Sequence, residues 1–326
     1  MTKPKVLVTR RWPAAVEAQL SEHFDTVLNV SDMPLTPDDF KAALASYDAV
    51  LPTVTDKIGA PALEIAKPQT KILANYGVGF SHIDMARVSD HGICVTNTPD
   101  VLSECTADLA MTLLLMVARR AGEGEREVRE GQWTGWRPTH LVGTKVSGKT
   151  LGIIGMGRIG QAVARRAHAF GMQVHYHNRK RLHKQTESAL EATYWESLDQ
   201  MVARMDVISI NCPHTPSTFH LMNARRLKLM KPDAVIVNTS RGEVVDENAL
   251  TRMLRAGEIK GAGLDVYEHG AEINPRLREL ENVVLLPHMG SATMEGRIEM
   301  GEKVIINIKT FDDGHRPPDQ VVPSMI

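Results

Sequence analysis

A glycine-rich turn between an apolar run and an amphipathic stretch constrains the fold of this chain more than any other feature. Residues Gly155–Gly160 (GMGRIG) follow the run Thr150–Ile154 and open the stretch Arg158–Phe170. The spacing G-x-G-x-x-G between a strand and a helix is typical of dinucleotide-binding units, in which the helix N-terminus faces the pyrophosphate. A tight turn without a ligand is the alternative. We predict cofactor contacts from five residues of this turn: Gly155, Gly157, Arg158, Ile159 and Gly160.

Short apolar runs alternate with longer amphipathic stretches on both sides of this turn. The expected strands are Lys5–Thr9, Ala49–Leu51, Lys71–Ala74, Ile93–Thr96, Thr150–Ile154, Gln173–His177, Asp206–Ile210, Ala234–Asn238, Gly261–Asp265 and Val283–Leu286. The main expected helices are Pro13–His23, Ala60–Ala66, Ser103–Glu130, Arg158–Phe170, Glu247–Ala256 and Thr293–Phe311. Such alternation predicts parallel βαβ units, and hence an α/β protein with Rossmann-like or flavodoxin-like sheets.

The length of 326 residues fits about two domains. The strand–helix pattern restarts near residue 100, and the final helix follows the last strand of the second half. We therefore expect a discontinuous first domain, residues 1–100 plus 292–326, and a dinucleotide-binding Rossmann domain, residues 101–291. In this arrangement the active site would lie in the cleft between the domains.

The overall composition excludes several classes of protein. Lys plus Arg total 38 and Asp plus Glu total 39, a formal net charge of −1, without the basic excess of nucleic-acid-binding proteins. Charged residues make up 24% and hydrophobic residues 43%, which is ordinary for a soluble globular protein. The longest apolar run, Leu109–Ala118, is too short to span a bilayer. We expect neither a nucleic-acid nor a membrane partner.

The cysteines and the N-terminal residues point to the cytoplasm. Cys94, Cys105 and Cys212 are widely spaced and form no CxxC pair, so neither a disulfide framework nor a zinc site is expected. The opening residues MTKPKVLVTRRW contain no apolar stretch of signal-peptide length. No cluster of His, Asp and Glu has ligand spacing, so we expect no metal.

The segment after the second strand of the dinucleotide-binding unit bears on which dinucleotide it binds. NAD-specific units usually place Asp or Glu about 20 residues beyond the glycines, where it accepts from the ribose 2′-hydroxyl. Here His175–Arg181 (HYHNRKR) contains no carboxylate before Glu187. Three cations follow Asn178, namely Arg179, Lys180 and Arg181. They suit a 2′-phosphate, so we predict cofactor contacts from Asn178, Arg179 and Lys180 and favour NADP(H) over NAD(H). A solvated basic loop is the alternative.

Two further side chains follow apolar strands, where α/β sheets place their ligands. Arg241 lies in the turn Asn238–Gly242 (NTSRG), and an arginine there can hold a carboxylate through two hydrogen bonds. His288 lies in Leu285–Ser291 (LLPHMGS), and an imidazole beside a carbonyl can deliver the proton that accompanies hydride addition. A surface arginine and an ordinary loop histidine are the alternatives.

Motifs along nearly the whole chain occur in the order of one known family. They are Asn75–Asp84 (NYGVGFSHID), Asn97–Ala110 (NTPDVLSECTADLA), Gly152–Gly160, Asn238–Asp246 (NTSRGEVVD), Gly261–Tyr267 (GAGLDVY) and Leu285–Thr293. The sequence resembles the D-isomer-specific 2-hydroxyacid dehydrogenase family, and most of all its glyoxylate/hydroxypyruvate reductase branch.

The resemblance implies a role for each matching residue. Arg241 would bind the substrate carboxylate and polarise the 2-oxo group, and His288 would be the general acid in reduction and the base in oxidation. The backbone N–H groups of Val78 and Gly79 would hold the carboxylate. Further implied cofactor contacts are Cys212 and Pro213 at the adenosine, with Thr239, Asp265, His288 and Gly290 toward the nicotinamide. Residues 120–145, with Trp133 and Trp136, match the family's dimerisation arm, so a homodimer is expected.

The chain departs from the family pattern at one position. The family carries a catalytic Glu, hydrogen-bonded to the His, five residues beyond the Asp that matches Asp265; here that position is Gly270. A carboxylate beside an imidazole stabilises its cationic form. Its loss predicts reduced activity with an acid-shifted pH profile, unless Glu268 or Glu272 takes the role.

Together these observations predict an enzyme that reduces a short 2-oxo acid, such as glyoxylate or hydroxypyruvate, with NADPH in preference to NADH. The alternative is a catalytically impaired dinucleotide-binding or sensing protein, which only the replacement at Gly270 favours. Formate and phosphite dehydrogenases are similar proteins, but the formate enzymes carry Gln at the position of Gly270.

Overall fold

Two parallel sheets form because short buried runs alternate with helices along the chain. The computed structural model describes residues 3–322. They divide into unit 1, residues 3–102 with 292–322, and unit 2, Ser103–Ser291. Every strand pairing within the two sheets is parallel, so the predicted α/β class with parallel sheets is confirmed.

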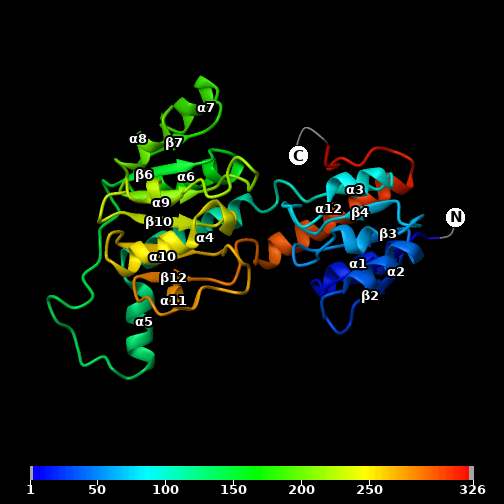
Figure 1. Ribbon diagram of the computed structural model, residues 1–326, viewed down its shortest axis with the longest axis horizontal. Helices are drawn as coiled ribbons and strands as arrows, with labels where there is room; N and C mark the ends of the chain where they lie inside the picture. The colour runs from blue at the N-terminus through cyan, green and yellow to red at the C-terminus, as the bar shows by residue number, and fades with distance from the viewer. Residues whose placement is uncertain (1–2, 323–326) are drawn as a thin grey trace. The chain divides into compact units, whose positions relative to one another are not determined.

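Unit 1 is a five-stranded sheet in the order β2-β1-β3-β4-β5, the flavodoxin-like arrangement (Figure 1). Its strands are β1 (Lys5–Val8), β2 (Asp25–Leu28), β3 (Ala49–Leu51), β4 (Ile72–Ala74) and β5 (Cys94–Thr96). Its helices are α1 (Ala14–His23), α2 (Pro37–Ser46), the 3-10 helix η1 (Ala60–Leu63), α3 (Met85–Asp90) and α12 (Met294–Asp312).

The C-terminal helix α12 completes the core of unit 1. Met300, Val304 and Ile308 pack in one apolar cluster with Val16 and Leu20 of α1. In Figure 1 this orange-red helix lies among the blue and cyan elements of the N-terminal segment. The unit is therefore built from two distant pieces of chain.

Unit 2 is a seven-stranded sheet in the order β12-β11-β10-β9-β6-β7-β8, the Rossmann order with an added strand. Its strands are β6 (Thr150–Ile154), β7 (Gln173–His177), β8 (Thr193–Tyr194), β9 (Val207–Ile210), β10 (Val235–Asn238), β11 (Gly261–Leu264) and β12 (Val283–Leu285). Its helices are α4 (Ser103–Ala118), α5 (Ala121–Arg129), α6 (Arg158–Ala169), α7 (Lys184–Ala189), α8 (Leu198–Val202), α9 (Ala224–Leu227), η2 (Gly242–Val244), α10 (Glu247–Arg255) and α11 (Pro275–Arg278).

Two of the expected helices differ from the structure. The long helix expected over residues 103–130 is divided into α4 and α5, because Arg120 adopts a left-handed backbone conformation with φ of 54°. The helix expected over residues 60–66 is the shorter η1. None of the helices within residues 3–322 combines the length and apolar character needed to cross a membrane.

Candidate active site

The glycine-rich turn joins β6 to α6 in unit 2. Gly155 has φ of 96°, and a Cβ there would lie 2.6 Å from the backbone nitrogen of Cys212. A Cβ on Gly160 would overlap the carbonyl oxygen of Gly155. A Cβ on Gly157, by contrast, would meet no described atom within 4 Å. Packing therefore requires the first and third glycines, whereas the second leaves backbone open for the approach of a ligand.

Asn178 connects this turn to the end of β7. Its Oδ1 accepts a hydrogen bond of 2.7 Å from the backbone N–H of Met156. Because β6 and β7 are neighbours, the two segments predicted to bind the cofactor lie side by side at the carboxyl edge of the sheet. The side chain of Asn178 thus fixes the conformation of the turn.

The basic segment after Asn178 is not uniform. Arg179 and Lys180 are exposed, and their side chains form no hydrogen bond or ion pair with the part of the chain that the structure describes. Arg181 donates to both carboxylate oxygens of Glu187, at 2.8 and 2.5 Å. This arginine and a hydrogen bond from Tyr176 lower the pKa of Glu187 to about 2. Arg181 is therefore engaged by Glu187, whereas Arg179 and Lys180 have side chains open to a ligand.

Cys212 and Pro213 lie just beyond β9, next to the glycine-rich turn. Burial raises the pKa of the Cys212 thiol to about 11, so this side chain is neutral at physiological pH. Pro213 is exposed. The backbone of Cys212 packs directly against Gly155.

The Arg241 turn follows β10 and is organised by Asn238. The amide of Asn238 donates to the carbonyl oxygen of Arg241 at 2.9 Å, and its Oδ1 accepts from the backbone N–H and hydroxyl of Ser240, both at 3.0 Å. Arg241 Nη1 donates to the carbonyl oxygen of Ser240 at 2.7 Å. Removal from water lowers the pKa of Arg241, and the charge of Glu243 acts in the opposite direction. An arginine nevertheless stays protonated in proteins, so the turn holds a permanent, partly desolvated positive charge.

Asp265 ties the end of β11 to the loop after β12. Its carboxylate accepts from the backbone N–H groups of Met289 at 2.8 Å and Gly290 at 2.9 Å. Burial raises the pKa of Asp265, whereas hydrogen bonds from the backbone of residues 288–290 lower it. His288 lies in this loop in a left-handed conformation with φ of 55°, and its side chain is exposed. The conformation of the histidine loop is therefore set from β11.

Asn211, after β9, and Thr239, after β10, each have a buried side-chain oxygen without a partner at this edge. The hydroxyl Oγ1 of Thr239 makes no hydrogen bond with any described residue. A buried polar group without a partner is costly, so its presence points to a ligand that completes the site. Thr239 lies between the Asn238 and Arg241 positions, at the centre of the candidate residues.

The segment that departs from the family pattern lies beyond β11. Gly270 has φ of 62°, and a Cβ there would meet no described atom within 4 Å. Glu268 has both oxygens engaged: Oε1 lies 2.8 Å from Nε2 of His220, and Oε2 accepts from the backbone N–H of Glu247 at 3.2 Å. Glu272 is exposed. The contacts of Glu268 thus give it a structural role that sequence analysis did not identify.

In unit 1, the loop after β4 carries Val78 and Gly79. The amide of Asn75 donates to the carbonyl oxygens of Gly77 at 2.9 Å and Gly79 at 3.0 Å. The amide of Asn97 donates to the carbonyl oxygen of Val78 at 2.8 Å. Within residues 3–322, the backbone N–H groups of Val78 and Gly79 have no acceptor. The loop therefore offers two adjacent donors to a bound anion.

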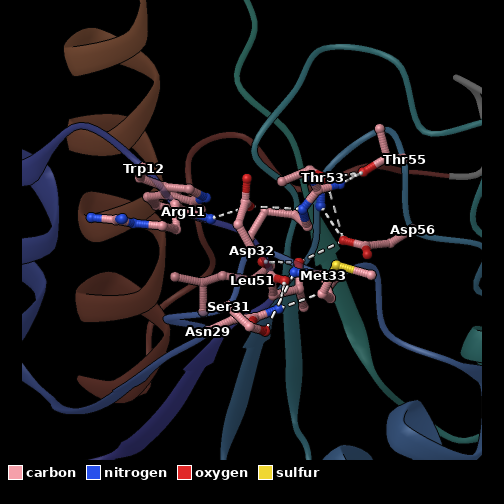
Figure 2. Close-up of polar contacts among 12 residues, drawn as sticks. Arg11, Trp12, Asn29, Ser31, Asp32, Met33, Leu51, Thr53, Thr55 and Asp56 are labelled. Carbon is pink, nitrogen blue, oxygen red and sulfur yellow. Dashed lines mark hydrogen bonds and ion pairs between the residues drawn. The ribbon is translucent and has the colours of Figure 1, made fainter.

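A polar network beside this loop was not predicted from the sequence (Figure 2). Oδ2 of buried Asp56 accepts from the hydroxyl of Thr9 at 2.5 Å and from the backbone N–H of Thr53 at 2.7 Å. Nε of Arg10 donates to Oδ1 of Asp32 at 2.9 Å, and Nη1 of the same arginine donates to the hydroxyl of Thr55, also at 2.9 Å. The network holds together the ends of β1 and β3, and Thr53 in turn bridges to Tyr76, just before the Val78 loop.

Known proteins are similar to this chain over nearly its full length. A profile of the D-isomer specific 2-hydroxyacid dehydrogenase NAD binding domain matches residues 111–290. The chain belongs to the D-isomer specific 2-hydroxyacid dehydrogenase family. A glyoxylate reductase of Thermococcus onnurineus is 42% identical over 323 residues, which cover 98% of this chain and 96% of the relative. A glycerate dehydrogenase of Hyphomicrobium methylovorum is 38% identical over 303 residues, 93% of this chain and 94% of the relative.

A solved structure extends this similarity to the fold. The NADPH-dependent glyoxylate/hydroxypyruvate reductase of Sinorhizobium meliloti, crystallised with NADP and malonate, superposes with a TM-score of 0.87 at 35% identity. The match covers 98% of this dehydrogenase chain and 97% of the reductase. This member of the family therefore shares the fold as well as the sequence motifs of its relatives.

Proposed function

We propose that this dehydrogenase reduces glyoxylate, hydroxypyruvate or a similar short 2-oxo acid to the D-2-hydroxy acid with a nicotinamide dinucleotide. One observation carries the proposal. Arg241 and His288 follow β10 and β12, and Asp265, which follows the intervening strand β11, accepts hydrogen bonds from the backbone of the histidine loop. A permanent positive charge and an imidazole are thus mounted on one rigid edge, as reduction of an anionic carbonyl compound requires.

The residues at this edge fit a dinucleotide. Backbone is open at Gly157 for a pyrophosphate, and the buried hydroxyl of Thr239 lacks a partner that a bound group would supply. Cys212 and Pro213 would form the wall beside the adenosine. Arg158, Ile159 and the backbone of residues 155–160 would face the phosphates, with Asp265, His288 and Gly290 near the nicotinamide.

When bound, the reduced nicotinamide supplies a hydride to the 2-oxo carbon. Arg241 would hold the substrate carboxylate and polarise the 2-oxo group. The backbone N–H groups of Val78 and Gly79 are proposed as substrate-binding donors of unit 1. His288 would give a proton to the oxygen as negative charge develops on it, and would take that proton back in the oxidation direction. Asp265 would keep His288 in place by fixing the backbone of its loop.

We propose that NADPH is preferred over NADH. Arg179 and Lys180 are exposed at the end of β7, where a 2′-phosphate lies in related units. The nearest following carboxylate, Glu187, is held by Arg181 and Tyr176 and is therefore not directed at a ribose hydroxyl. Positive charge without a competing carboxylate favours the phosphorylated cofactor.

We also propose that turnover is lower than a carboxylate at position 270 would allow. Glycine supplies no negative charge to stabilise a cationic imidazole in the transition state. The contacts of Glu268 with His220 and Glu247, which engage both of its carboxylate oxygens, support this proposal.

The enzyme is proposed to act as a homodimer in the cytoplasm. Figure 1 shows α5 and the following loop extending away from the sheet of unit 2. Trp133 and Trp136 on this segment are 55% and 82% exposed, and such aromatic surface favours burial by a partner subunit. The three cysteines are free thiols, in keeping with a reducing compartment.

A panel of 2-oxo acids assayed with NADPH and NADH tests the proposal. We expect turnover of glyoxylate or hydroxypyruvate, with a higher kcat/KM for NADPH. Absence of turnover with every short 2-oxo acid, combined with tight dinucleotide binding, would instead support a sensing protein. Equal or better use of NADH would refute the cofactor preference alone.

A further inference from the structure

A His–Glu pair, His220 and Glu268, lies beside the Arg241 turn, apart from the proposed proton donor His288. Nε2 of His220 is 2.8 Å from Oε1 of Glu268, and their side chains are 30% and 12% exposed. A carboxylate can only accept, so this ring nitrogen carries the hydrogen. Phe219 stacks on the imidazole, with ring centroids 4.0 Å apart and planes at 14°. Both the position and the tilt of the ring are therefore fixed.

His220 is also joined to the Arg241 turn through its backbone. Its N–H donates to the carbonyl oxygen of Glu243 at 2.8 Å, and the N–H of Met222 donates to that of Val244 at 3.0 Å. The segment after β9 thus runs along the residues that directly follow Arg241. Any movement of His220 shifts the C-terminal side of that turn.

Glu268 holds the opposite side of the same turn. Gly242 packs so closely on the backbone of Tyr267 and Glu268 that a Cβ would overlap it. Glu268 and buried Glu247 each accept the other's backbone N–H, at 3.2 and 3.0 Å. The Arg241 turn is therefore enclosed by two segments, and the His220–Glu268 hydrogen bond joins these segments to each other.

The conformation of His220 needs this support. Its φ of 47° places it in the left-handed region, which residues other than glycine rarely adopt. Such strain persists where surrounding contacts over-determine the conformation, and it clusters at functional sites. Here the backbone hydrogen bond to Glu243 and the side-chain contact with Glu268 both act on the strained residue.

We propose that His220 and Glu268 are positioning residues that set the orientation of Arg241. This inference rests on the proposed function, in which Arg241 holds the carboxylate of the 2-oxo acid. Neither residue needs to touch a reactant, since both act through the backbone of Gly242 and Glu243. Loss of the pair widens the range of Arg241 orientations, and so weakens carboxylate binding while leaving the dinucleotide site intact.

His220→Asn separates this role from a merely structural one. Asparagine tolerates a left-handed backbone, so the variant keeps the fold, but its side chain is too short to reach Glu268. We expect a rise of about tenfold in the KM for glyoxylate, with the KM for NADPH and the melting temperature unchanged. Glu268→Gln keeps an oxygen for the N–H of Glu247 and an amide toward His220, and should lose only about twofold to threefold. Exposed Glu279→Gln, just after α11, is the matched control and should equal the parent enzyme.

A parallel measurement keeps this inference distinct from the proposed function. Malonate carries carboxylates but no 2-oxo group, so its binding to the NADPH-loaded protein, followed by calorimetry, reports on the carboxylate site without turnover. If the parent binds malonate yet reduces no 2-oxo acid, the proposed reaction is wrong. In that case, malonate binding that is about tenfold weaker in His220→Asn than in the parent still supports the positioning role of His220. Unchanged malonate binding and glyoxylate KM in His220→Asn, or an equal rise in the KM for NADPH, would overturn it.

Discussion

Arg181 and Glu187 form a two-point ion pair, in which Nε and Nη2 of the arginine meet the two carboxylate oxygens at 2.8 and 2.5 Å. The guanidinium also lies over the ring of Tyr194, 5.5 Å from its centroid. Arg181 therefore stabilises the loop that follows β7, and we expect Arg179 and Lys180 to determine any specificity for a phosphate.

The first prediction concerns these two residues. In Arg179→Ala combined with Lys180→Ala, the KM for NADPH should rise about tenfold to a hundredfold, because two charge-assisted contacts with a phosphate are lost. The KM for NADH should change little. The control is Arg181→Gln combined with Glu187→Gln, which removes one charge of each sign and should leave the ratio of the two KM values unchanged. An equal rise in the KM values for NADPH and NADH in the Arg179→Ala, Lys180→Ala variant would contradict the assignment of these two residues to the 2′-phosphate.

A second prediction contrasts two glycines of the same turn. Gly157→Ala places its methyl group in open space, so the melting temperature should not change, but the KM for the dinucleotide should rise about tenfold or more. Gly160→Ala should instead destabilise the fold by about 1–3 kcal/mol, because its methyl group overlaps the carbonyl of Gly155. Thermal unfolding and cofactor titration measure both effects. Normal cofactor binding by Gly157→Ala would place the pyrophosphate elsewhere.

Restoring a carboxylate at position 270 is the third test. Gly270→Glu should raise kcat about tenfold and extend reduction to higher pH, because a neighbouring carboxylate raises the pKa of an imidazole acid. The left-handed φ of 62° costs a side chain about 1–2 kcal/mol, so Gly270→Gln is the control that carries the same backbone cost without charge. Identical pH–rate profiles for the two variants would show that the residue at position 270 does not act on His288.

The fourth prediction follows from buried Asp56. Burial raises the pKa of this carboxyl, and the hydrogen bonds from Thr53 and Thr9 only partly oppose that shift. The native state thus keeps the proton to higher pH than the unfolded chain does, so stability falls as pH rises from the unfolded pKa, about 3.9, through the folded one. Asp56→Asn removes this dependence. The melting temperature of Asp56→Asn, measured relative to that of the parent enzyme, should therefore rise as pH increases from about 4 to about 7.

A pH-independent difference between Asp56→Asn and the parent enzyme would show that Asp56 does not bind a proton differently in the folded and unfolded states.

Most of the fold could be predicted because the buried strands are apolar on both faces. All three residues of β4 and all four of β9 are buried, and such runs are recognised in sequence without knowledge of their neighbours. Strand β2 (Asp25–Leu28) was missed because it lies at the sheet edge, where none of its residues is fully buried. The break at Arg120 was missed because arginine carries no turn signal, although its backbone is left-handed in the structure.

The candidate site, like the fold, could be predicted from the sequence only in part. The rule that ligands bind beyond strand ends was enough to single out Arg241 and His288 from the sequence. The contacts that orient these residues join distant positions, as Asp265 does with Met289 and His220 with Glu268. No local pattern encodes such pairs, so only the folded chain reveals them.

The two-piece construction of unit 1 has a consequence for how the enzyme is made. Helix α12 packs so tightly on α1 that a Cβ on Gly301 would overlap Val16, yet the 189 residues of unit 2, Ser103–Ser291, separate it from the rest of its unit (Figure 1). A ribosome delivers all of unit 2 before it delivers this helix. Unit 2, which is continuous in sequence, can complete its core during synthesis. The first 102 residues, by contrast, keep an apolar face exposed until α12 has been synthesised. The nascent N-terminal segment is therefore the part of this enzyme most in need of chaperone protection.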